Sequence, residues 1–93
     1  MNEPYIFPKA KFVDENTLDE QFNYIRSEFI EAVRAEGMGE RDEELADLWH
    51  SIETYFRIRE KQGIAVSEVI NHVKQKNGLR GYYENNGGDI NVT

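Results

Sequence analysis

Apolar residues recur every three or four positions in the first half of the chain, which is the spacing of an amphipathic helix. The first such stripe consists of Leu18, Phe22, Ile25, Phe29, Ala32 and Val33. Thr17 and Glu20 precede it with the spacing of a capping box, in which each side chain caps a backbone N–H of the first turn. The pattern predicts a long helix that begins at Thr17, ends near Gly37 or Gly39, and buries Phe22 and Phe29.

Two more helices are predicted after this one. The second begins around residues 40–42, where acidic side chains suit the positive end of a helix dipole, and ends near Gly63. Its apolar stripe consists of Leu45, Leu48, Ile52 and Phe56, with Trp49 beside it. The third carries Val66, Val69, Ile70 and Val73 and ends at residues 77–78. Because few residues separate the first two helices, we expect them to form an antiparallel hairpin.

The two ends of the chain differ from this helical middle. Residues 1–16 contain both prolines and alternate aromatic with polar residues, which indicates an extended N-terminal arm. Residues 84–93 are rich in asparagine and glycine, which is typical of a mobile C-terminal tail. The sequence thus predicts one all-α domain over residues 17–83, built as a compact helical hairpin plus a third helix.

The length of the chain limits how much core one copy can form. A chain of 93 residues buries only about 60–65% of its unfolded surface. Small domains compensate with disulfides, structural metals or self-association. Because the chain has no cysteine, disulfides and thiolate zinc sites are excluded. We therefore expect copies to pack through their apolar faces into an oligomeric helical bundle.

The charge balance narrows the range of partners. The formal net charge of −7 argues against binding to bulk nucleic acid, because that affinity depends on cationic contacts to phosphate. An anionic substrate could bind only after a metal ion had neutralised the acidic groups of the protein's site. No stretch has the length of a membrane span, and residues 1–11 lack the apolar core of a secretory signal. The expected compartment is the cytoplasm.

Two pairs of carboxylates are the main candidates for chemistry. Glu28 and Glu31 form the first pair, and Glu44 and Asp47 follow after twelve intervening residues. Each pair is spaced i,i+3, so both members project from one helix face at the edge of the predicted apolar stripe. Four carboxylates that meet in a hairpin would repel one another unless a cation lay between them. Mg²⁺ or Mn²⁺ suits such a site because both prefer oxygen ligands.

These residues resemble the signature of the MazG-like, all-α nucleoside triphosphate pyrophosphohydrolases. Residues 43–48 resemble that family's second acidic motif, and residues 74–82 are similar to the Lys/Asn/Arg-Gly-Tyr segment that follows its third helix. The resemblance covers residues 17–83. One departure is Ser27, where the family often has a glutamate before the first motif; this position is not the one usually assigned to the metal.

The resemblance implies a reaction and a set of site residues. The metal ligands for Mg²⁺, with Mn²⁺ able to substitute, would be Glu28, Glu31, Glu44 and Asp47. Water would attack the α-phosphorus of a (deoxy)nucleoside triphosphate, with Glu28 or Glu31 as its base, and release the monophosphate and pyrophosphate. Substrate contacts are implied for Lys74, Asn77 and Arg80. The resemblance also implies a homodimer or homotetramer, because members of the family are typically dimers or tetramers, and a role in nucleotide-pool control or in the removal of non-standard nucleotides.

Two alternatives stay open at this point. The same metal cluster would also suit a phosphohydrolase that acts on a dinucleotide or a signalling nucleotide. In the other alternative, the carboxylates form a solvated face, and the protein is an acidic helical interaction module, antitoxin-like or an inhibitor, without catalysis. Acidic residues at i,i+3 are common on exposed helix faces, so the bare spacing does not distinguish these possibilities.

Overall fold

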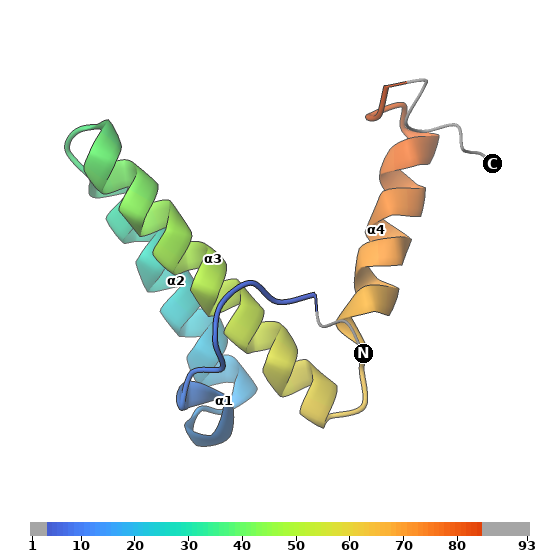
Figure 1. The fold of residues 1–93 in the computed structure, drawn as a ribbon, viewed down its shortest axis with the longest axis horizontal. Helices are drawn as coiled ribbons and strands as arrows, with labels where there is room; N and C mark the ends of the chain where they lie inside the picture. The colour runs from blue at the N-terminus through green and yellow to red at the C-terminus, as the bar shows by residue number, and fades with distance from the viewer. Residues whose placement is uncertain (1–3, 85–93) are drawn as a thin grey trace.

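The computed structural model describes residues 4–84 and shows an all-helical protein (Figure 1). The described residues form helices α1 (Phe12–Glu15), α2 (Leu18–Arg34), α3 (Met38–Lys61) and α4 (Val66–Leu79) and no strand. The predicted all-α class is therefore confirmed. The predicted mobile tail lies outside the described residues except for Glu84.

Helices α2 and α3 form the predicted hairpin and lie side by side (Figure 1). The capping box is present, because Thr17 Oγ1 accepts a hydrogen bond from Glu20 N at 3.1 Å and Thr17 N donates to Glu20 Oε1 at 2.8 Å. Gly37 precedes α3 with a φ of +95°, a conformation that glycine adopts without steric cost. This sharp turn allows α3 to begin at Met38, a few residues earlier than the sequence predicts.

The contact between α2 and α3 is unexpectedly polar. On α2 the buried side chains are Gln21, Glu28 and Ala32, and the amide of Gln21 donates to the Ser51 carbonyl at 3.0 Å. Phe22 and Phe29 are 60% and 55% exposed, so the prediction that they form the core is wrong for the single chain. They lie on the flank of α2, because the adjacent row of residues occupies the contact with α3.

The apolar stripe of α3 is only partly covered. Ser51, Thr54 and Ile58 are buried, whereas Leu45 and Ile52 of the stripe are 46% and 37% exposed and Trp49 beside it is 50% exposed. Among the described residues, only four apolar side chains are buried, namely Val13, Ala32, Ile58 and Val66, while fifteen large ones are exposed. One copy of the chain therefore leaves much of its apolar surface uncovered.

The N-terminal arm is held against α3 by hydrogen bonds between the backbone of the arm and side chains of α3. The buried carboxylate of Glu53 accepts hydrogen bonds from Ile6 N and Phe7 N, both at 2.9 Å, and Arg57 Nη2 donates to the Phe7 carbonyl at 3.1 Å. The Phe7 ring stacks on His50 with centroids 4.6 Å apart. Residues 12–15 form the short helix α1 where the sequence predicted extended chain, because α1 packs on α3 and buries Val13.

Removing the Glu53 carboxylate is expected to destabilise the protein. Glu53→Ala leaves two backbone N–H groups without their charged acceptor, which lowers the free energy of unfolding by roughly 2–3 kcal/mol. Urea unfolding followed by Trp49 fluorescence measures the change, since Phe7 packs edge-on to that indole at 6.0 Å. The exposed Glu43→Ala is the control. A loss below about 0.5 kcal/mol, the range of ordinary surface substitutions, would show that the arm does not depend on this contact.

Helix α4 leaves the end of α3 and runs away from the hairpin (Figure 1). Only Val66, at its first position, is buried. The radius of gyration of 15.7 Å exceeds the roughly 12 Å of a compact chain of this length, which agrees with this open arrangement. None of the helices within residues 4–84 is long and apolar enough to cross a lipid bilayer.

Candidate metal centre

Three of the four predicted carboxylates lie together between α2 and α3. Glu28 and Glu31 come from one turn of α2, and Glu44 comes from the first half of α3. Each offers a carboxylate oxygen within 4.8 Å of the other two. The antiparallel hairpin produces this cluster. The turn at Gly37 lies between the two acidic motifs, so both motifs lie at about the same distance from the turn along the hairpin.

Glu28 occupies the most unusual position of the three. Its side chain is buried in the α2–α3 contact, with only 7% of the residue exposed. Its Oε1 atom is buried and accepts no hydrogen bond from the described residues, and the same holds for Oε1 of Glu44. A buried carboxylate oxygen without a donor is costly, so such atoms are normally paired or bound to a metal. The cluster thus presents unsatisfied oxygen ligands at one point.

The electrostatics of the cluster also favour a cation. Burial raises the pKa of Glu28 above its ordinary 4.5; the nearby Tyr24 hydroxyl opposes this, and the charges of Glu31 and Asp47 add to it. Burial likewise raises the pKa of Glu44, and the neighbouring carboxylates raise it further. Within the described chain, every charge that shifts these two groups is negative. A bound cation would remove this repulsion.

Asp47 and Tyr24 lie at the margin of the cluster. Asp47 is exposed and does not belong to the group of three, but its charge is close enough to raise the pKa of Glu28 and Glu44. Tyr24 was not among the predicted site residues. Its position one helical turn before Glu28 is the only sequence signal that relates it to the cluster.

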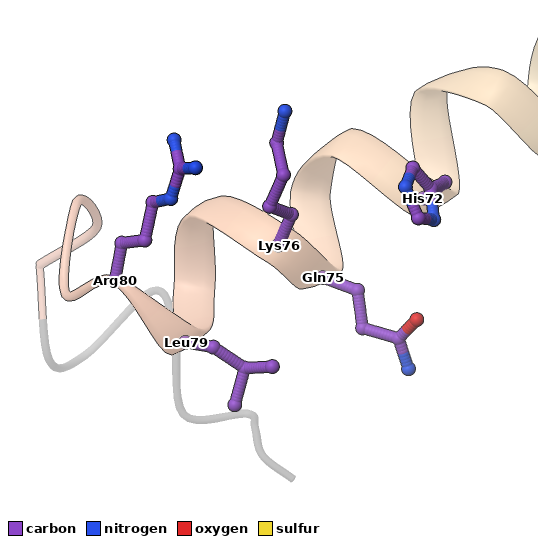
Figure 2. Close-up of a pocket in the computed structure, with 5 residues that line it drawn as sticks. All are labelled: His72, Gln75, Lys76, Leu79 and Arg80. Carbon is purple, nitrogen blue, oxygen red and sulfur yellow. The ribbon is translucent and has the colours of Figure 1, made fainter.

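The predicted substrate residues lie elsewhere in the chain. Lys74, Asn77 and Arg80 belong to α4 or its end, and α4 runs away from the hairpin (Figure 1). Arg80 lines an open hollow of about 380 Å³ together with His72, Gln75, Lys76 and Leu79. Figure 2 shows Lys76 and Arg80 extending to the same side of the helix. The structure therefore does not bring these three residues to the carboxylates of the same chain.

The raised pKa of Glu28 predicts a specific dependence of stability on pH. A carboxyl group whose pKa is higher in the folded state stabilises the fold below about 4.5, and this contribution disappears as the pH rises through the folded pKa. In EDTA, Glu28→Gln should therefore be more stable than the wild type at pH 7 and equal to it near pH 4. Thermal unfolding between pH 4 and pH 8 measures the difference, with Glu43→Gln as the control. A difference that grows toward low pH would contradict the assignment.

Fold and site together define an all-helical protein with a carboxylate cluster between two antiparallel helices. Comparisons of the chain with protein-family models, with curated proteins and with solved structures find no match. A functional assignment therefore depends on the residues and their geometry.

Proposed function

We propose that the protein is a Mg²⁺-dependent hydrolase that converts (deoxy)nucleoside triphosphates to monophosphates and pyrophosphate. The observation that carries this proposal is Glu28, a buried carboxylate with an unpartnered oxygen, beside Glu31 and Glu44. A purely solvated acidic face would not bury such a group. The motif resemblance of residues 17–83 supports the choice of reaction.

In this proposal Glu28, Glu31 and Glu44 would surround the ion, and Asp47 would complete the set from the edge of α3. Whichever of Glu28 and Glu31 serves as the base would lie beside the ion rather than bind it permanently. Mn²⁺ is able to substitute. A bound Mg²⁺ supplies charge that offsets the repulsion between acidic site and triphosphate, and it polarises the phosphoryl oxygens. Glu28 or Glu31 accepts the proton of the water that attacks the α-phosphorus.

The substrate would also need cationic and polar contacts outside the carboxylates. Lys74 and Arg80 carry the charge to bind phosphate oxygens, and the amide of Asn77 has both donors and acceptors for a base or sugar. The biological role that follows is control of the cytoplasmic nucleotide pool or removal of non-standard nucleotides.

Pyrophosphate release from a panel of ribo- and deoxynucleoside triphosphates tests the proposal. We expect release with Mg²⁺, none with EDTA, and a nucleoside monophosphate as the co-product. Orthophosphate, or two mononucleotides from a dinucleotide, would favour the alternative phosphohydrolase. No release from any substrate, without a thermal shift by Mg²⁺, would favour the acidic interaction module.

A further inference from the structure

The amide of Gln21 joins α2 to α3 and to the residue that ends α1. The Gln21 side chain is 1% exposed. Its Nε2 atom donates to the Ser51 carbonyl of α3 at 3.0 Å, and its Oε1 atom accepts a hydrogen bond from Asn16 Nδ2 at 2.8 Å. A backbone carbonyl only accepts hydrogen bonds, so the contact with Ser51 determines the orientation of the amide. Both ends of this buried amide are therefore used.

The contact of Gln21 with Ser51 has the same helix register as the carboxylate cluster. Glu28 follows Gln21 by seven residues on α2, and Glu44 precedes Ser51 by seven residues on α3. Because the two helices are antiparallel, one alignment of α2 on α3 produces both contacts. Seven residues make nearly two helical turns and a rise of about 10.5 Å, so Gln21 and Glu28 face α3 from the same side of α2.

The cluster lies between this hydrogen bond and the turn at Gly37. Gly37 precedes Glu44 by seven residues, and Ser51 follows it by the same number. Between these two points, carboxylate oxygens of Glu28, Glu31 and Glu44 lie within 4.8 Å of one another. Like charges at this separation repel and push α2 and α3 apart until a cation binds. The turn holds the helices together on one side of the cluster, and the Gln21 amide holds them on the other.

A buried amide penalises other arrangements of the two helices more strongly than an apolar side chain does. An apolar side chain at this position packs in several alignments, whereas the Gln21 amide has its partners only where Ser51 and Asn16 lie at its two ends. Shifting α2 by one turn, about 5.4 Å, leaves the buried amide without them. Setting the register of packed helices is the best-attested use of such groups. The same shift would separate Glu28 from Glu44.

We propose that Gln21 is a positioning residue for the metal centre: its hydrogen bonds to Ser51 and Asn16 fix the alignment of α2 and α3 in which Glu28 and Glu44 share one cation. The inference rests on the proposed function for the presence of that cation. Gln21 touches neither the cation nor the substrate, so it acts on the affinity for the cation and not on the chemical step. Asn16 contributes by holding the Gln21 amide in its orientation.

The affinity of Gln21→Met for Mn²⁺ tests the proposal. Methionine keeps the length of the side chain and removes both hydrogen-bonding groups. Electron paramagnetic resonance measures free Mn²⁺ without nucleotide, and we expect about tenfold weaker binding, as is found when groups behind metal ligands are removed. Asn16→Ala, which removes only the donor to Gln21, should weaken binding less and serves if Gln21→Met does not fold. Unchanged affinity in both variants would overturn the proposal.

The control is Gln75→Met, which makes the same substitution at an exposed glutamine of α4 and should bind Mn²⁺ like the wild type. Turnover at increasing Mn²⁺ provides a second readout. Gln21→Met should need more of the ion but reach the kcat of the wild type, because the chemical groups are intact. A lower kcat at saturating Mn²⁺ with unchanged affinity would contradict a positioning role.

The alignment of the helices can be measured without metal or substrate. The chain has no cysteine, so Arg26→Cys on α2 and Asp42→Cys on α3 place two spin labels at exposed positions. In EDTA, the distance between the labels should be narrowly distributed with Gln21 and broader or shifted in Gln21→Met. Identical distributions would overturn the proposal. If the wild type binds no Mn²⁺ and hydrolyses no triphosphate, the proposed function fails, and these distances still decide whether Gln21 sets the register.

Discussion

Glu44→Gln is expected to lower the rate of pyrophosphate release at least about 100-fold, whereas Glu43→Gln changes it less than about twofold. The two residues are neighbours on α3 and carry the same charge, so the pair controls for net charge and helix propensity. Glu44 lies in the carboxylate group with Glu28 and Glu31, while Glu43 is exposed and does not belong to it. The difference between the variants therefore reports the cluster alone.

Circular dichroism and thermal unfolding of both variants show whether the fold is kept. We expect Glu44→Gln in EDTA to be at least as stable as the wild type, because it removes a carboxylate whose pKa is raised by burial and by its acidic neighbours. Equal losses of activity in the two variants would mean that the acidic surface acts only through its total charge.

Mg²⁺ is expected to stabilise the wild-type protein strongly. An ion that binds only the folded state and is present at 100 times its dissociation constant raises the free energy of unfolding by about 2.7 kcal/mol. For a domain of this size, that contribution corresponds to a rise in Tm of roughly 10 °C or more. The physical reason is that the ion both satisfies the buried Oε1 atoms of Glu28 and Glu44 and removes the repulsion between them.

The same pair of variants, Glu43→Gln and Glu44→Gln, serves as the control for the stabilisation by Mg²⁺. Glu43→Gln should show the same Tm increase with Mg²⁺ as the wild type, and Glu44→Gln should lose most of it. Potassium chloride at equal ionic strength measures general screening. If potassium produces the same rise as Mg²⁺, or if Glu44→Gln responds like the wild type, the cluster is not the binding site.

Local sequence signals predicted the helices well. The apolar spacing of three and four residues marks α2, α3 and α4, and the capping box at Thr17 sets the start of α2. These features act between residues close in sequence, so they can be recognised without knowing the tertiary structure. The acidic spacing similarly predicted the group of Glu28, Glu31 and Glu44, because a hairpin with a short turn leaves little freedom in how its helices align.

The apolar spacing did not predict which side chains are buried between helices, because burial depends on contacts between residues far apart in the sequence. The stripe with Phe22 and Phe29 looked like a core, but Gln21 and Glu28 occupy the contact with α3 instead. Periodicity identifies an apolar face and does not say whether the same chain or another copy covers it. The hydrogen bonds of Glu53 to Ile6 and Phe7 connect residues that are separated by 47 and 46 positions in the sequence. No local motif marks these contacts. The direction of α4 likewise depends on the hydrogen bond from Val66 N to Glu60 Oε2.

The central claim is that water attacks the α-phosphorus of a nucleoside triphosphate. The product that carries the oxygen atom from water tests this claim most directly. The wild-type protein is incubated with Mg²⁺ and the nucleoside triphosphates in water enriched in ¹⁸O, and the products are analysed by mass spectrometry. Attack at the α-phosphorus predicts one ¹⁸O atom in the nucleoside monophosphate and unlabelled pyrophosphate. Label in the pyrophosphate or in orthophosphate, or no turnover of any triphosphate, would contradict it.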